Sequence, residues 1–183
     1  MNVTKRRIFE ISTQLFAEKG YEATSIEEIT AVVGIAKGTL YYHFESKEEM
    51  FNQLIQDGAD FLKKSIDIKT RNVTNPVEKI KRIIIIQIKI SKKFDKFMTM
   101  LFTQMWGNEA RNKFVRQKID EYINKIKPIA EEAINQGYFK NMTSEILTDL
   151  IFGQISCVLK RKLNDEKIEV EKLGEEYLNA ILS

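Results

Sequence analysis

The sequence predicts an all-α fold, and three observations lead to this prediction. The 183 residues include only two prolines and eight glycines, so most of the chain contains no residue that interrupts a helix. Apolar residues recur three and four positions apart along these stretches, as they do on the buried face of a helix. Capping motifs and glycines mark where single helices begin and end.

Residues 24–47 contain two short predicted helices around a tight turn. Ser25 and Glu28 form a capping-box pattern at the start of the first helix, and Gly34 ends it as a residue free to adopt a positive φ. The second helix is predicted from Lys37 to about His43. This arrangement is a helix-turn-helix, which places its second helix in the major groove of DNA.

The outer face of the second helix is polar and aromatic. Leu40 and Phe44 lie four residues apart and share the side that can pack on the first helix. The other side chains can bond phosphate oxygens or base edges, and the glycine allows close approach of the DNA. The candidate DNA contacts on this face are Lys37, Gly38, Thr39, Tyr41, Tyr42 and His43.

The run LFAEKGYEATSIEEITAVVGIAKGTLYYHFESKEEMF, residues 15–51, resembles the DNA-binding domain of the tetracycline-repressor (TetR) family. The resemblance extends over about residues 2–62, and many positions match at fixed spacing. It implies a homodimeric transcription repressor whose variable C-terminal domain binds a small inducer, and it adds Ser25 and Lys47 to the DNA contacts. Glu27 stands where some relatives carry a basic residue, so no operator sequence can be transferred.

The remaining helices are predicted from the same signals. The first runs from Thr4 to Lys19, and a fourth begins at Lys47 and leaves the DNA-binding domain without a flexible linker. Asn75 and Pro76 mark the next start. A long helix ending at residue 136 and two further helices, about 144–163 and 166–182, complete the chain. The resemblance places the homodimer interface on those last two helices.

The segment EKIKRIIIIQIKIS, residues 78–91, fits two structures. Its β-branched residues and alternating isoleucines are typical of a strand. A single strand in a helical chain would have no partner, which favours a buried helix. This helix is expected to continue into residues 94–106, where aromatic and methionine side chains surround the helix axis and indicate burial or a cavity lining.

A small and largely apolar effector is the expected ligand of the C-terminal part. The aromatic and thioether side chains of residues 94–106 either line its site or form plain core. Tyr122 or Gln104 would hold the ligand in orientation. The candidate ligand contacts are Phe94, Phe97, Met98, Phe102, Trp106, Tyr122 and Phe152.

Charge and cysteine content set further limits. The net charge is only +3, and residues 1–47 carry six Lys or Arg and six Asp or Glu, so DNA binding depends on where the cations lie. Cys157 is the only cysteine, which excludes an intramolecular disulfide, and it is expected to be buried. No apolar run is long enough for a signal peptide or a membrane span. We therefore expect a cytoplasmic protein.

Two other functions compete with DNA-binding regulation. An enzyme is disfavoured because no nucleophile–base pair or paired carboxylate stands out, and His43 is the only histidine. No cluster has metal-ligand spacing, so no cofactor is expected. A helical protein-interaction module would not explain the polar and aromatic face beside two capping boxes.

The prediction is therefore a sequence-specific transcriptional regulator that is not an enzyme. Residues 1–47 are expected to form its helix-turn-helix domain, and residues 48–183 a helical domain for ligand binding and dimerisation. It is expected to act as a repressor that a small hydrophobic effector releases from a pseudo-palindromic DNA operator.

Overall fold

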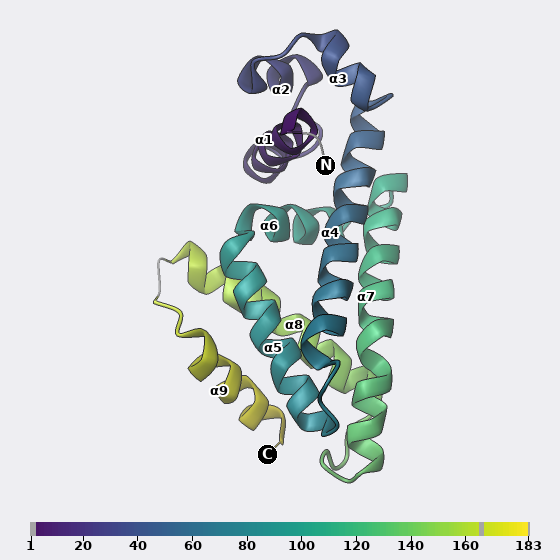
Figure 1. The fold of residues 1–183 in the computed structure, drawn as a ribbon, viewed down its shortest axis with the longest axis vertical. Helices are drawn as coiled ribbons and strands as arrows, with labels where there is room; N and C mark the ends of the chain where they lie inside the picture. Colours follow the sequence, from purple (N-terminus) through teal and green to yellow (C-terminus); the bar gives the residue numbers. More distant parts are fainter. Residues whose placement is uncertain (1–2, 165–166, 183) are drawn as a thin grey trace. The chain divides into compact units, whose positions relative to one another are not determined.

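The computed structural model describes residues 3–164 and 167–182, which form helices and contain no strand (Figure 1). The all-α prediction is therefore confirmed for the described residues. None of the helices within those ranges is both long and apolar enough to cross a membrane. The helices are α1 (Val3–Lys19), α2 (Ile26–Val33), α3 (Lys37–His43), α4 (Lys47–Thr70), α5 (Pro76–Lys93), α6 (Asp95–Gln104), α7 (Ala110–Asn135), α8 (Ser144–Leu163) and α9 (Val170–Leu182).

The helices pack into two compact units. The first unit comprises Met1–Gly58 and Lys96–Lys118, and the second comprises Ala59–Asp95 and Ile119–Ser183. These packing units are not the two domains predicted on either side of residue 47, because α6 and the start of α7 pack with the N-terminal helices. The helices α4 and α7 each continue from one unit into the other.

Local signals define the helices of the first unit. The side chain of Ser25 caps α2 by accepting the backbone N–H of Glu28 at 3.1 Å, and Gly34 ends the helix with a φ of +78°. The reciprocal half of this capping box does not form, because the Glu28 carboxylate accepts from Lys19 instead. Three rings then fill the core beside these helices, with Tyr21 5.3 Å from Phe16 and 5.1 Å from Phe51 between ring centroids.

The helix α5 is central to the second unit, where it packs against both α8 and α9. Asn75 caps it by accepting the N–H groups of Val77 and Glu78 at 2.9 and 3.0 Å, and Pro76 occupies the first helical position. The alternating isoleucines that resembled a strand are buried on several sides of a helix. Tertiary burial therefore outweighs the β-propensity of these residues.

Three details differ from the predictions. The helix expected to run continuously from α5 into residues 94–106 is broken at Phe94, whose backbone is not helical and whose ring packs edge-on against Phe61 at 5.7 Å. The last helix starts at Val170, whereas the predicted start at residue 166 lies outside the described residues. Cys157 is exposed and not buried, because it lies on a side of α8 that turns away from the core of this chain.

Gly58 lies in the middle of α4, directly under the ring of Phe97 from α6. A methyl group added at Gly58 would overlap that ring. We expect Gly58→Ala to lower the free energy of unfolding by about 1–3 kcal/mol, because overpacking outweighs the gain in helix propensity of about 1 kcal/mol. Thermal and urea unfolding of the DNA-free protein would measure this change.

Gly38→Ala is the matched control, since a methyl group on that helical glycine meets nothing within 4 Å. It should leave stability unchanged or raise it slightly. Equal effects of the two substitutions would mean that the ring of Phe97 does not require a glycine at position 58.

Candidate nucleic-acid interface

The outer face of α3 is open, as the sequence predicted. Leu40 and Phe44 are 0% and 2% exposed and anchor the helix on its neighbours, whereas Tyr41 and Tyr42 are 45% and 85% exposed. The rings of Tyr42 and His43 stand edge-on at 5.2 Å, and Gly38 has open space around it. Large aromatic side chains this exposed on a short helix indicate a surface that contacts another molecule.

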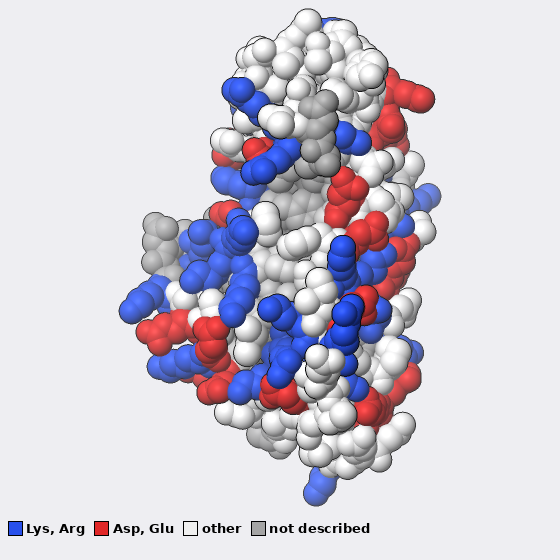
Figure 2. Space-filling model, in the orientation of Figure 1, with Lys and Arg blue, Asp and Glu red and all other residues white. Residues whose placement is uncertain are grey.

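The only lysine of α3 forms an ion pair with an acidic side chain. Lys37 forms an exposed ion pair with Glu27 of α2 and lies 5.9 Å from the ring of Tyr41. The hydrogen bond from Lys37 lowers the pKa of Glu27, and the carboxylate in turn raises the pKa of Lys37. Both groups are therefore charged at neutral pH, and Lys37 reaches a DNA phosphate or base only by leaving or sharing its carboxylate partner. In Figure 2 few blue side chains cover α2 and α3.

The ammonium group of Lys47 is largely bonded within the protein and is not a free phosphate contact. Its ammonium donates to the backbone carbonyls of Tyr21 and Thr24, each at 2.9 Å, and stands 4.2 Å from the centroid of the Tyr21 ring. Two of its three N–H groups are therefore used inside the protein. Through these bonds Lys47 holds the start of α4 against the turn between α1 and α2, and only its third N–H is available to DNA.

Sequence reasoning did not identify Arg111 as part of this region. Its guanidinium carbon lies 4.6 Å from the centroid of the Tyr21 ring, and the guanidinium pairs with Glu22 at 2.6 Å. It also donates to Gln104 at 3.2 Å, which occupies the side chain that had been considered for ligand orientation. Nothing in the local pattern around Arg111 signals this role, because its partners come from a distant part of the chain.

The seven candidate ligand contacts are divided between the two units. Phe97, Met98, Phe102 and Trp106 belong to the first unit, while Phe94, Tyr122 and Phe152 belong to the second. Trp106 is 72% exposed, whereas Met98 and Tyr122 are buried. Tyr122 and Phe152 lie together, with ring centroids 6.3 Å apart.

Tyr122 belongs to a buried polar chain that joins three helices of the second unit. Gln154 of α8 donates to Gln87 of α5 at 2.7 Å, and Gln87 donates to the Tyr122 hydroxyl of α7 at 2.9 Å. Burial raises the pKa of Tyr122, so the phenol keeps its proton. Within the described residues, Gln154 Oε1 and Ser91 Oγ are buried without a hydrogen-bond partner. The sequence signal for this site was Gln87, the one amide inside a run of isoleucines.

A capped α2, a tight glycine turn and an exposed α3 define a helix-turn-helix protein of the kind that binds the major groove of DNA. Comparison with known proteins gives the family. The profile described as bacterial regulatory proteins of the tetR family matches residues 8–54. A solved protein of Clostridium perfringens, described as a candidate fatty acid metabolism regulator, is 33% identical over 96% of both chains, with a TM-score of 0.89.

Two more distant relatives align over the same length. The transcriptional repressor KstR2 of Mycobacterium tuberculosis is 23% identical over 100% of this chain and 92% of its own. FadR of Bacillus subtilis, solved in complex with stearoyl-CoA, is 20% identical over 97% of both chains, with a TM-score of 0.83. The chain belongs to the TetR family of transcriptional regulators, and the predicted regulatory, non-enzymatic class is confirmed.

The two backbone hydrogen bonds of Lys47 lead to a stability prediction. We expect Lys47→Ala to lower the free energy of unfolding by about 1–3 kcal/mol, because hydrogen bonds from an ammonium group are lost and two carbonyls lose their partner. Lys113→Ala, at an exposed lysine of the same unit, should have little effect. If Lys47→Ala keeps full stability and only reduces the salt dependence of DNA binding by about one counterion, Lys47 contacts phosphate and does not stabilise the fold.

The ion pair between Lys37 and Glu27 leads to a prediction about DNA affinity. Glu27→Gln should strengthen binding to duplexes of unrelated sequence and steepen its salt dependence by about one counterion, because Lys37 is then free to pair with phosphate. Fluorescence anisotropy titrations over a range of salt concentrations would measure both quantities. Glu109→Gln makes the same charge change elsewhere on the first unit, and an equal gain from it would show that Lys37 is not involved.

Proposed function

We propose that this protein is a dimeric repressor that a fatty acyl-CoA thioester releases from its operator. The observation that carries the DNA-binding part is the exposed face of α3 beside the capped α2. Support for the effector class comes from two relatives, one described as a candidate regulator of fatty acid metabolism and one solved with stearoyl-CoA. Its site of action is then the bacterial cytoplasm, where the DNA is.

The proposed DNA contacts divide into reading and positioning. Lys37 and Tyr41 read base edges in the major groove, and Ser25 offers its hydroxyl proton to a phosphate at the N-terminus of α2. Lys47 positions the start of α4. The other proposed contacts on the face of α3 are Gly38, Thr39, Tyr42 and His43. Residues 1–47 thus form the DNA-contacting part, and residues 48–183 the part for effector binding and dimerisation.

The last two helices carry the proposed dimer interface. Ile146 and Leu150 of α8 are 51% and 47% exposed, and Cys157 lies exposed further along the same helix. Leu182 near the end of α9 is also exposed. An apolar surface of this kind is stable in water when a second copy covers it. Two copies then present two recognition helices to half-sites about one helical turn apart.

The effector is proposed to reach the buried polar chain of the second unit. The Tyr122 hydroxyl can donate to a thioester carbonyl, and Gln154 Oε1 can accept an amide N–H of the pantetheine arm. Phe152 beside Tyr122 supplies an apolar wall for the acyl chain. Phe94 is a further proposed contact in the second unit, whereas the predicted contacts Phe97, Met98, Phe102 and Trp106 belong to the first unit and are not part of this proposed site. The ligand acts only if it prefers the released state of the dimer, since equal affinity for both states shifts nothing.

The experiment is operator release measured by anisotropy, using DNA from upstream of the protein's own gene and saturated acyl-CoA thioesters of several chain lengths. We expect one chain length to release the DNA and free CoA to have no effect. Tyr122→Phe should raise the thioester concentration needed by roughly tenfold, since it removes one buried hydrogen bond to the ligand. Operator affinity without thioester should stay unchanged.

Tyr138→Phe is the control, because Tyr138 lies in the same unit but is 42% exposed, and its hydroxyl accepts a hydrogen bond from Asn75 at the surface. It should respond to the thioester like the natural protein. If no thioester of any chain length releases the DNA, the effector class is wrong. If Tyr122→Phe and Tyr138→Phe respond alike, Tyr122 does not hold the effector.

A further inference from the structure

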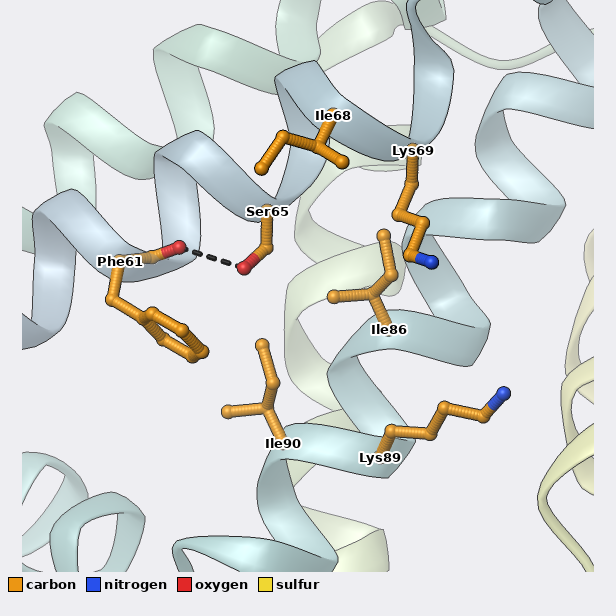
Figure 3. Close-up of a pocket in the computed structure, with 7 residues that line it drawn as sticks. All are labelled: Phe61, Ser65, Ile68, Lys69, Ile86, Lys89 and Ile90. Carbon is orange, nitrogen blue, oxygen red and sulfur yellow. Dashed lines mark hydrogen bonds between the residues drawn. The ribbon is translucent and has the colours of Figure 1, made fainter.

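The second unit contains an open groove between α4 and α5, with a volume of about 210 Å³ (Figure 3). None of its lining residues belongs to the buried polar chain of Tyr122 or to the proposed DNA contacts. Its walls are almost entirely apolar. The lining residues are Phe61, Ser65, Ile68 and Lys69 of α4 and Ile86, Lys89 and Ile90 of α5.

The apolar side chains of this groove are poorly covered by the chain itself. Phe61 and Ile68 are 50% and 56% exposed, although they lie on a helix that has a well-packed opposite side. Phe94 is 39% exposed and stands edge-on to Phe61, so the apolar surface extends beyond one end of the groove. Ser65 does not offer its proton to a ligand, because its hydroxyl donates to the carbonyl of Phe61 at 2.8 Å.

The other end of the groove is cationic. In Figure 3 the side chains of Lys69 and Lys89 both lie at the end of the groove opposite Phe61, and their ammonium groups point away from Phe61. Lys69 has no carboxylate partner among the described residues, and Lys89 pairs at 2.9 Å with Glu171, where both side chains are more than half exposed. Figure 2 shows Lys and Arg side chains gathered over α5.

The nearby acidic groups do not cancel this charge. Asp60 and Asp67 lie on α4 near the groove, but each already pairs with another lysine. Asp60 pairs with Lys63 at 3.0 Å, and Asp67 pairs with Lys125 at 2.6 Å. The ammonium of Lys69 is thus the one cation of the groove that no carboxylate among the described residues neutralises.

From this arrangement we propose that the groove binds a free fatty acid. The alkyl chain lies over Phe61, Ile68 and Ile90, and the carboxylate lies between the ammonium groups of Lys69 and Lys89. An apolar channel that ends in cations matches a molecule with one apolar chain and one anionic head. Seven residues of α4 separate Phe61 from Ile68, which is about 10 Å at the helical rise and suits a medium-length chain.

This site goes beyond the proposed acyl-CoA response, because it takes the free acid and uses different residues. The probe is decanoate below its micelle concentration, titrated into the full-length, DNA-free protein by calorimetry. Phe61→Ser and Ile68→Ser change exposed side chains and should each weaken binding by roughly tenfold through loss of apolar contact. The neutral analogue decanol should bind the natural protein more weakly than decanoate.

Charge variants test the head-group end. Lys69→Glu should weaken decanoate binding by roughly tenfold and leave decanol binding unchanged, while Lys69→Arg should keep decanoate binding. Lys140→Glu is the control, since Lys140 is an exposed lysine of the same unit away from the groove. An equal effect of Lys69→Glu and Lys140→Glu would show only general attraction of an anion and would overturn the proposal.

Two further results would also overturn it. One is decanoate binding that resists Phe61→Ser and Ile68→Ser but is lost in Tyr122→Phe, which would place the acid in the buried site. The other is a change of oligomeric state in Ile68→Ser by sedimentation velocity, which would mean that a second copy of the chain covers the groove. Operator release is not measured in these titrations, so failure of the acyl-CoA proposal remains a separate outcome.

Discussion

The contacts of the Tyr21 ring with two other rings and two cations form a bracket on which the first unit depends. The ring lies against Phe16 and Phe51 in the core, and Lys47 and Arg111 both place a cation near it. Cation–π contacts of this kind are strongest when water is partly excluded, as it is around a ring that is 7% exposed. The bracket fixes the turn between α1 and α2 to the first turn of α4. Since α2 and α3 follow directly from that turn, their orientation depends on it.

A second constraint operates in the second unit, where α5 buries a broad apolar face against α8 and α9 while Arg82 and Lys89 stay exposed. Isoleucine suits this face because it fills volume, but apolar contacts alone supply no directional feature that fixes the rotation of the helix. The amide of Gln87 supplies one, since it bonds both Gln154 and Tyr122. Buried polar groups that are satisfied only in one arrangement favour that arrangement over its neighbours. The same chain leaves Gln154 Oε1 without a hydrogen-bond partner among the described residues, which supports the proposed effector site.

Much of the fold could be predicted because its signals are local. Ser25, Gly34 and Asn75 act within a few residues of themselves, and each is found where the capping rules place it. The break at Phe94 could not be predicted, because it depends on Phe61 and on packing far away in sequence. The exposed face of α3 followed from Leu40 and Phe44, but the partners of Lys47 did not. A lysine next to a helix start suggests phosphate equally well, and only the fold brings the carbonyls of Tyr21 and Thr24 to it.

The charge balance of the proposed interface predicts discrimination between sequences rather than strong general attraction. Phosphate contacts supply most non-specific affinity, and each depends on a free cation. Here Lys37 is held by Glu27, and Lys47 spends two of its N–H groups inside the protein. We therefore expect these two lysines to contribute little general attraction to DNA, so that the proposed contacts of Tyr41 and Tyr42 contribute proportionally more. Under the proposed function, an effector then has only to weaken the specific contacts, because little non-specific affinity would hold the protein on the DNA.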